Sequence, residues 1–260
     1  MFINKASASK IKAYDSCKQK YKFRYIDRLR GTYNEGLNTD ALQFGSYIHR
    51  IFELGVKAKT VEELEAIADS ERPNYKFASK NDKRVGPMLK NFIRLNEQLT
   101  DTVGVELIFE VPMSEGYALN GIIDRVVKGK TGRYLVIDYK TSKRASTKQD
   151  LYQDVQMMMY AFAIHKLYEI PIEDVQVAHY YPHMDKLVTI KYLPSQLNIF
   201  MRKITNRIWE IRKRKKIEFL PTLNQFCNWC NFKELCPEFG GTPQKLEEAI
   251  SSEGNAGPRK

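Results

Sequence analysis

The amino-acid sequence predicts an α/β protein in which helices flank a central mixed β-sheet. Two apolar runs in the middle of the chain, Gly121-Ile-Ile-Asp-Arg-Val-Val and Tyr134-Leu-Val-Ile-Asp-Tyr-Lys, are separated by a short Lys/Gly/Thr-rich segment and predict a β-hairpin. Amphipathic segments on both sides of the hairpin predict helices. Four cysteines, one near the start of the chain and three near its end, are candidate ligands of a metal site.

The segments before the hairpin predict helices and a first strand. Ser7 or Ser9 can serve as the N-cap of the first helix. Thr60-Val-Glu-Glu63 has the form of a capping box, in which the threonine and the glutamate each satisfy a free backbone donor. We expect helices at 7–28, at 41–59, directly after Thr60 and at 82–100, followed by a strand at 104–113.

The hairpin strands are expected at 117–127 and 133–140, and prolines mark most of the boundaries that follow. We expect a helix at 147–169, strands at 174–181 and 186–193, a basic helix from 194 to about 216 and a cysteine-rich segment at 226–237. Residues 240–260 are rich in Gly, Ser and Glu without periodicity, so we expect a mobile tail there.

Two aspartates and a lysine in the hairpin point to chemistry. Carboxylates rarely enter buried strands unless they are paired or bind a metal ion. Neighbouring strands lie about 5 Å apart, so Asp124 and Asp138 can converge on one cation. Lys140 shares a strand face with Asp138. Two acids and an ammonium at one point predict phosphodiester chemistry with a hard cation, although each acid taken singly could be part of a structural ion pair.

All four cysteines fall into one pattern. Cys17 lies near the start of the chain, and Cys227, Cys230 and Cys236 lie close together near its end. C-x-x-C spacing lets two thiolates reach one metal ion, so the spacing alone favours zinc. Four thiolates also suit an iron–sulfur cluster. Nothing like a signal peptide precedes Cys17, so we expect a reducing compartment and no disulfide scaffold.

With these motifs the chain resembles the PD-(D/E)XK nuclease superfamily, in particular its RecB-type branch. That family has an Asp after a Gly-hydrophobic-hydrophobic step and then a hydrophobic strand ending in (D/E)-x-K, as at Asp124 and Asp138-Tyr-Lys140. Its helical Gln-x-x-x-Tyr is matched by Gln156 and Tyr160, and its upstream helical histidine by His49. The resemblance extends from about residue 7 to residue 236 and implies a restriction-endonuclease-like core.

The resemblance implies metal-dependent hydrolysis of DNA and assigns roles to residues. The implied catalytic residues are Asp124, Asp138, Lys140, Gln156 and Tyr160. The implied ligands of one or two Mg²⁺ or Mn²⁺ ions are His49, Asp124, Asp138 and the backbone carbonyl of Tyr139. A packed core histidine is the alternative for His49, and ordinary polar residues are the alternative for Gln156 and Tyr160. Glu106 or Glu110, which alternate onto one strand face, is a candidate supplementary acid.

The cysteine pattern also resembles the iron–sulfur subgroup of RecB-type nucleases. In that subgroup one N-terminal and three C-terminal cysteines hold a [4Fe–4S] cluster that ties the two chain ends together. The resemblance therefore implies a cluster held by Cys17, Cys227, Cys230 and Cys236, with zinc as the alternative.

The net charge favours a polyanionic partner. Forty-two basic and thirty-one acidic residues give a formal charge of +11, and no apolar stretch approaches the ~20 residues of a membrane span. Two basic segments are candidate DNA contacts, although a solvated helix face is the alternative for the second. Their residues are Lys18, Lys20 and Arg24 in the first, and Arg212, Lys213 and Arg214 in the second.

These observations predict one nuclease domain at 1–239, with a core at about 41–193, a metal-cluster cap formed by about 7–30 and 195–239, and a tail at 240–260. The expected function is a stand-alone DNA exonuclease of phage or bacterial recombination, replication or repair, in the bacterial cytoplasm. The alternatives are a structure-specific or CRISPR-adaptation endonuclease and a non-catalytic DNA-binding module with a vestigial nuclease fold. Polarity, strand preference, and a homo-oligomer or a partner protein of recombination or replication stay open.

Overall fold

The computed structural model describes residues 4–29, 39–99 and 101–254. By their internal contacts the chain divides into two compact units. One unit combines the described parts of Met1–Asn38 and Ile204–Lys260, and the other is Thr39–Lys203. The second unit contains the mixed sheet with flanking helices that the sequence predicts, so the α/β class is confirmed.

The sheet of the second unit runs in the order β2-β3-β4-β5-β6. Its strands are β2 Asp101–Met113, β3 Tyr117–Lys128, β4 Tyr134–Tyr139, β5 Val175–Tyr181 and β6 Lys186–Lys191. The pairs β2/β3, β3/β4 and β5/β6 are antiparallel, whereas β4/β5 is parallel. A parallel pair requires a crossover connection, and helices α6 and α7 provide it. The predicted strands are therefore present, with ends that shift by up to three residues.

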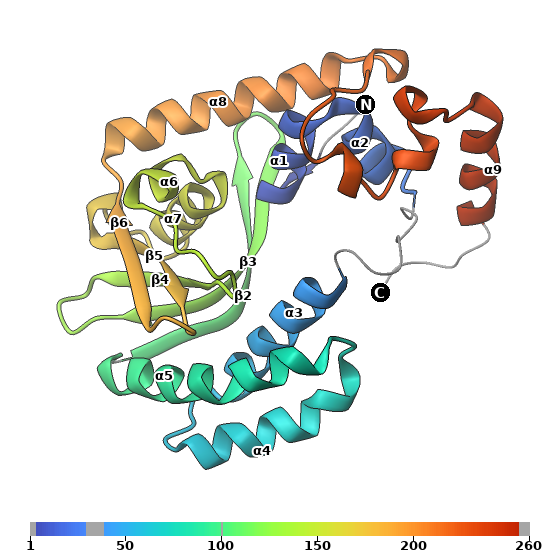
Figure 1. The fold of residues 1–260 in the computed structure, drawn as a ribbon. Coiled ribbons are helices and arrows are strands. Elements are labelled where there is room, and N and C mark those ends of the chain that lie inside the picture. The colour runs from blue at the N-terminus through green and yellow to red at the C-terminus, as the bar shows by residue number, and fades with distance from the viewer. Residues whose placement is uncertain (1–3, 30–38, 100, 255–260) are drawn as a thin grey trace. The chain divides into compact units, whose positions relative to one another are not determined.

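Helices cover both sides of this sheet (Figure 1). One group comprises α3 Thr39–Leu54, α4 Val61–Glu71 and α5 Val85–Gln98, and the other comprises α6 Lys148–Gln153 and α7 Val155–Leu167. The expected capping box of α4 forms between Thr60 and Glu63. Short 3₁₀ helices lie at Arg72–Asn74, Ser79–Arg84 and Ile172–Asp174.

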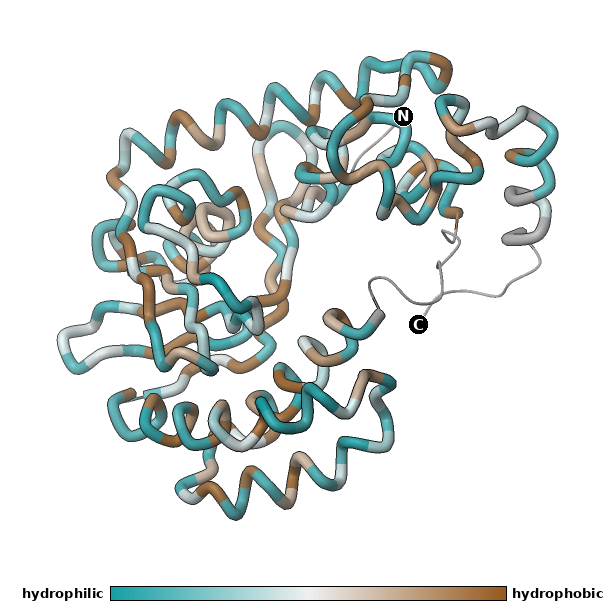
Figure 2. Tube along the Cα trace, in the orientation of Figure 1, coloured by the Kyte–Doolittle hydropathy of each residue, from teal (hydrophilic) through white to brown (hydrophobic). Residues whose placement is uncertain are grey.

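The core of the second unit lies between the sheet and the first helix group. Phe52 and Phe92 stack with ring centroids 3.9 Å apart, and Tyr139 of β4 meets both rings edge-on. In Figure 2 apolar residues dominate the central strands, whereas α4 alternates between apolar and polar residues as one of its faces turns inward. Because side chains alternate along a strand, Tyr139 faces this core and its neighbour Asp138 faces α7.

Gly121 lets two strands and a helix approach closely. A Cβ atom at this position would lie 2.7 Å from the Phe109 ring and 3.6 Å from the Tyr160 ring. Any side chain would therefore force the Phe109 ring of β2 to shift, whereas the Tyr160 ring of α7 would be in ordinary van der Waals contact. This contact gives a physical reason for glycine in the segment Gly121-Ile-Ile-Asp124.

The first unit contains segments from both ends of the described chain. It comprises strand β1 Lys5–Ala6, helices α1 Ala8–Ser16 and α2 Lys18–Tyr21, a π-helix at Lys22–Ile26, residues 204–213 of α8 Pro194–Lys213, and α9 Pro243–Gly254. Short 3₁₀ helices lie at Lys216–Glu218, Cys227–Trp229, Lys233–Leu235 and Pro237–Phe239. One cluster packs Tyr14, Tyr21, Ile211 and Phe219, and another packs Phe23, Leu29 and Phe232.

Three expectations differ from the structure. The helix expected at 7–28 is interrupted at Cys17, which is extended with φ −161°. The helix expected at 147–169 is interrupted at Asp154, whose carboxylate caps α7 by accepting from the Gln156 backbone N–H. Within the expected tail, residues 243–254 form α9, and Leu246 packs against the Phe23 cluster. The rest of that tail, 255–260, lies outside the described residues.

None of the helices that the structure describes combines the length and the apolar character that crossing a membrane requires.

Candidate active site

The hairpin places its two aspartates side by side. The register Arg125↔Ile137 between β3 and β4 brings Asp124 next to Asp138, and both side chains are buried. Asp124 Oδ2 accepts the Tyr139 backbone N–H at 2.7 Å. Asp138 Oδ2 lies 2.6 Å from the Lys140 ammonium, and its Oδ1 accepts from Gln156 Nε2 at 3.0 Å. The structure thus brings the Asp–Asp–Lys set together.

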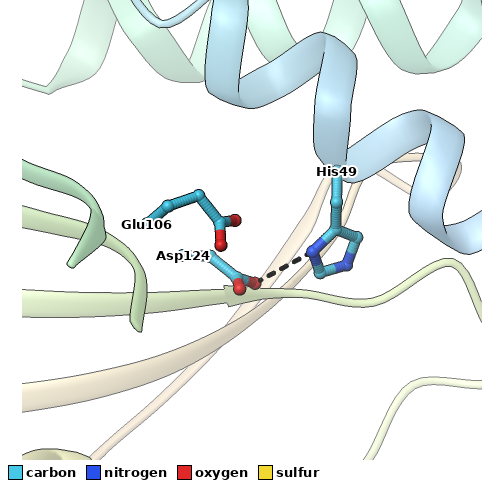
Figure 3. A group of neighbouring side chains, drawn as sticks. All are labelled: His49, Glu106 and Asp124. Carbon is cyan, nitrogen blue, oxygen red and sulfur yellow. Dashed lines mark ion pairs between the residues drawn. The ribbon is translucent and has the colours of Figure 1, made fainter. Parts of the chain in front are cut away.

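His49 reaches the same place from α3. Its Nε2 lies 2.9 Å from the Tyr139 carbonyl oxygen, and its Nδ1 lies 3.5 Å from Asp124 Oδ2. Figure 3 shows the His49 ring turned toward Asp124, with Glu106 on the other side of the carboxylate. One ligand atom from each of these three residues lies within 4.8 Å of the other two.

Glu106 is the residue that the sequence could not single out from Glu110. It lies opposite Asp124, between the pairs Val105↔Arg125 and Leu107↔Ile123 of β2 and β3. Its φ of +46° is a left-handed conformation that non-glycine residues rarely adopt and that costs about 1–3 kcal/mol. Glu110 stays in regular strand and is exposed. Such strain at a cluster of acids is typical of a functional site.

Burial and neighbouring charges shift the proton affinities in this cluster. Burial raises the pKa of Asp138 to about 6; the Lys140 charge opposes this rise and Asp124 adds to it. Burial alone would lower the pKa of Lys140, but the charge and hydrogen bond of Asp138 outweigh it, so this pKa is raised. Burial, and then the Asp124 charge, raise the pKa of Glu106. Acidic groups held against their own repulsion are suited to binding a cation.

Gln156 and Tyr160 hold the site from α7. Besides its hydrogen bond to Asp138, Gln156 Nε2 donates to the Tyr160 hydroxyl at 2.7 Å. The Tyr160 hydroxyl in turn donates to the Ile122 carbonyl of β3. These contacts link both strands of the hairpin to one helix. The register Asp138↔His179 also places the buried His179 ring on β5, with Nε2 3.9 Å from Asp138 Oδ2. No local sequence pattern predicts this neighbour, because it depends on the β4/β5 register.

The residues present fit a divalent cation. Two carboxylates and an imidazole at mutual distances within 4.8 Å are oxygen and nitrogen donors of the kind that Mg²⁺ or Mn²⁺ accepts. Asp138 does not belong to this trio, since its oxygens face Lys140 and Gln156.

The four cysteines line one small cavity in the first unit, with a volume of about 30 Å³. None of them is in a disulfide. The sulfur of Cys17 accepts the Thr222 backbone N–H at 3.4 Å, and the sulfur of Cys227 accepts that of Asn224 at 3.3 Å. Burial raises the pKa of Cys236, and the neighbouring thiols of Cys17 and Cys230 raise it further. Clustered thiols with backbone N–H donors fit a thiolate-bound metal centre.

The six candidate DNA contacts differ in the partners that their charged groups have within the protein. Lys20 lines the cysteine cavity, Arg24 lies over the Tyr25 ring and Arg212 lies over the exposed Trp209 ring. Lys18 lies over the Tyr14 ring, and Lys213 is exposed. Arg214 instead donates to the Tyr14 hydroxyl, the Glu210 carboxylate and the Glu218 carbonyl, each at 2.9 Å. Its guanidinium is occupied within the protein.

A mixed sheet that carries acids, a lysine and a histidine at one point suits metal-dependent phosphodiester chemistry. The model of the PD-(D/E)XK nuclease superfamily matches residues 5–237, and the chain belongs to this superfamily.

The comparisons with individual proteins agree with this family. The chain is 24% identical over 200 residues to an ATP-dependent helicase/deoxyribonuclease subunit of Streptococcus agalactiae serotype Ia, covering 70% of this chain and 18% of that protein. It is 25% identical over 219 residues to the subunit of the same name from Streptococcus pyogenes serotype M1, covering 74% and 20%. The chain thus spans about a fifth of these relatives. A putative exonuclease from Eubacterium rectale shares the fold, with a TM-score of 0.54, 14% identity and 87% of each chain covered.

Proposed function

We propose that this chain is a DNA exonuclease that hydrolyses phosphodiester bonds with Mg²⁺ or Mn²⁺. The observation that carries the proposal is the trio of His49, Glu106 and Asp124 next to Asp138 and its Lys140 ion pair. The superfamily supports nuclease chemistry, and the name of the Eubacterium rectale protein with the same fold supports an exonuclease.

The ligands of one or two cations would be His49, Glu106, Asp124, Asp138 and the Tyr139 carbonyl. A cation bound there would neutralise charge on the phosphate and lower the pKa of a bound water. Lys140 would donate a hydrogen bond to the attacking water or to the phosphate oxygen that gains charge. Gln156 would fix the orientation of Asp138, and Tyr160 would fix that of the β3 backbone.

Two other functions use the same residues. A structure-specific or CRISPR-adaptation endonuclease would need only a different path for the DNA. A non-catalytic DNA-binding module would have no need for Lys140 to keep its 2.6 Å contact with Asp138 or for Glu106 to stay strained. These two features favour an enzyme.

We further propose that Cys17, Cys227, Cys230 and Cys236 hold a [4Fe–4S] cluster, with zinc as the alternative, as a structural centre of the first unit. The shared cavity and the two N–H···S contacts support a metal centre of either kind. Lys18, Lys20, Arg24, Arg212 and Lys213 are proposed to contact DNA phosphates through their charge. The names of the relatives as subunits support a partner protein, which we propose to be one of recombination or replication, or a second copy of this chain.

The test of the function is digestion of DNA labelled at the 5′ or the 3′ end, single- or double-stranded, with Mg²⁺, Mn²⁺ or a chelator. We expect metal-dependent release of short products from an end and little cleavage of closed circular DNA. Cleavage of circular DNA at a similar rate would favour the endonuclease, and no cleavage of any substrate would favour the binding module.

Replacing Glu106 by glutamine is expected to raise the Mg²⁺ concentration needed for half-maximal activity by about tenfold or more, since one anionic oxygen donor is lost. Without metal the variant should unfold at a slightly higher temperature, because the repulsion between Glu106 and Asp124 is relieved. Activity against Mg²⁺ concentration and metal-free thermal unfolding measure the two effects. Glu110→Gln, an exposed change on the same strand, is the control and should alter neither; a Glu106→Gln enzyme with the wild-type Mg²⁺ requirement would contradict the assignment.

A further inference from the structure

A second cavity lies in the unit Thr39–Lys203, which also contains the candidate active site, and shares no residue with that site. It is an open cavity of about 640 Å³ between the turn after α3, the end of α5 and the start of β2. This volume is in the range of about 300–1,000 Å³ that is usual for ligand pockets.

Arg125 of β3 forms part of the cavity wall and is only 3% exposed. Its Nε and Nη2 donate to Thr102 Oγ1 at 3.1 and 2.8 Å, and its Nη1 donates to Asn96 Oδ1 at 2.5 Å. Both partners are neutral. Among the residues that the structure describes, no carboxylate lies within 4.0 Å of this guanidinium.

A purely structural role would not account for the charge. The three hydrogen bonds link β3 to α5 and to the register shift of β2 near Thr102, but a neutral amide could make such links. A guanidinium stays protonated at all ordinary pH values, and a buried charge without a counter-charge is costly. With the Tyr139 hydroxyl as a fourth acceptor, four of the five N–H donors are used, and one has no partner among the residues that the structure describes.

The rim of the cavity adds adjustable charges of both signs. Lys57 and Lys59 are exposed on the α3–α4 turn, and Glu97 and Asp101, which line the same cavity, are exposed as well. These four charges balance, so the fixed charge at the base is that of Arg125. Lys57 and Lys59 line the same cavity as Arg125 and would attract an anion bound there.

We propose that this cavity binds one phosphate group through the Arg125 guanidinium, either a phosphate of a DNA strand or that of a free nucleotide. The positive charge of the guanidinium attracts phosphate, and its remaining N–H group can donate one hydrogen bond to a phosphate oxygen. Binding at this cavity does not require the proposed nuclease activity and is measured without cleavage.

Thr102 offers a matched pair of variants that differ in charge alone. Thr102→Asp places a carboxylate at the guanidinium and should weaken inorganic phosphate binding at least tenfold, because the charge is then neutralised inside the protein. Thr102→Asn, with the same shape and no charge, should stay within about threefold of wild type. The measurement is calorimetric titration with inorganic phosphate in metal-depleted buffer, at ionic strength held constant with chloride.

Two further arms identify the source of the phosphate. If Thr102→Asp weakens the binding of a deoxynucleoside monophosphate and leaves the binding of a single-stranded oligonucleotide unchanged, the ligand is a free nucleotide. If Thr102→Asp weakens oligonucleotide binding at least tenfold, the ligand is a DNA strand. Should Thr102→Asp fail to fold, the exposed double variant Lys57→Glu/Lys59→Glu should weaken phosphate at least threefold. Equal phosphate binding by the two Thr102 variants, an unchanged affinity in the double variant, or no binding by wild type at tens of millimolar, would overturn the proposal.

Discussion

Replacing Asp138 by asparagine is expected to slow DNA cleavage by about a thousandfold or more, because a bound cation and Lys140 lose their shared anionic partner. The fold should survive the change. Burial raises the pKa of Asp138 to about 6, above its ordinary value, so the folded protein disfavours the ionised form and tolerates a neutral amide at pH 7. The oxygen of the asparagine amide can still accept the hydrogen bond from Gln156.

The rate is measured on end-labelled DNA at saturating Mg²⁺ or Mn²⁺, beside thermal unfolding. Asp174→Asn removes the same charge from an exposed ion pair with Arg133 and should leave the rate unchanged. Asp124→Asn should act like the Asp138 variant. Lys140→Met should slow DNA cleavage by about 100-fold or more, since it removes a hydrogen-bond donor to the reacting groups. Metal-free DNA binding should survive, because Lys140 is not a metal ligand. Near-normal turnover in a folded Asp138 or Asp124 variant would remove both aspartates from the proposed mechanism.

The strands and the positions of the acids within them could be predicted from the sequence, because local rules determine both. Apolar runs of strand length around a short polar turn predict a hairpin, and the two-residue period predicts that Asp138 and Lys140 share a face. The hairpin alone predicts that the two acids can converge, and the observed register Arg125↔Ile137 places Asp124 beside Asp138. The contact between Lys140 and Asp138 at 2.6 Å follows from the same period.

Features that depend on backbone strain or on distant register could not be predicted. Glu106 and Glu110 are equivalent by alternation, and only the left-handed φ of Glu106 distinguishes them. His179 reaches Asp138 through the parallel β4/β5 pairing, which the chain makes across two helices. The break at Asp154 competes with a continuous helical pattern and is decided by its side-chain cap on Gln156. Helix α9 depends on packing of Leu246 that its composition does not reveal.

Replacing Cys17 by alanine is expected to release the metal of the first unit and to lower its unfolding temperature by about 10 °C or more. Metal bound only by the native state stabilises that state, and the loss of about 2 kcal/mol shifts the midpoint of a 60–100-residue unit by about 8–16 °C. Cys17 precedes Cys236 by most of the chain, yet both line one cavity of about 30 Å³, so a shared metal would restrain two distant segments. Protein purified without oxygen should be brown if the metal is an iron–sulfur cluster and colourless if it is zinc.

The comparison that separates structural from catalytic roles is Cys17→Ala beside Asp138→Asn, with metal content, unfolding temperature and cleavage rate measured on each full-length variant. Cys17→Ala should lose iron or zinc and thermal stability, and lose activity only as the protein unfolds. Asp138→Asn should keep the cysteine-bound metal and the stability while losing cleavage. Ser16→Ala, which changes a cavity residue without a sulfur, is the control and should resemble wild type in all three. If Cys17→Ala keeps its metal and melts like wild type, Cys17 is not a ligand, because loss of one of four thiolates cannot leave a structural metal centre unaffected.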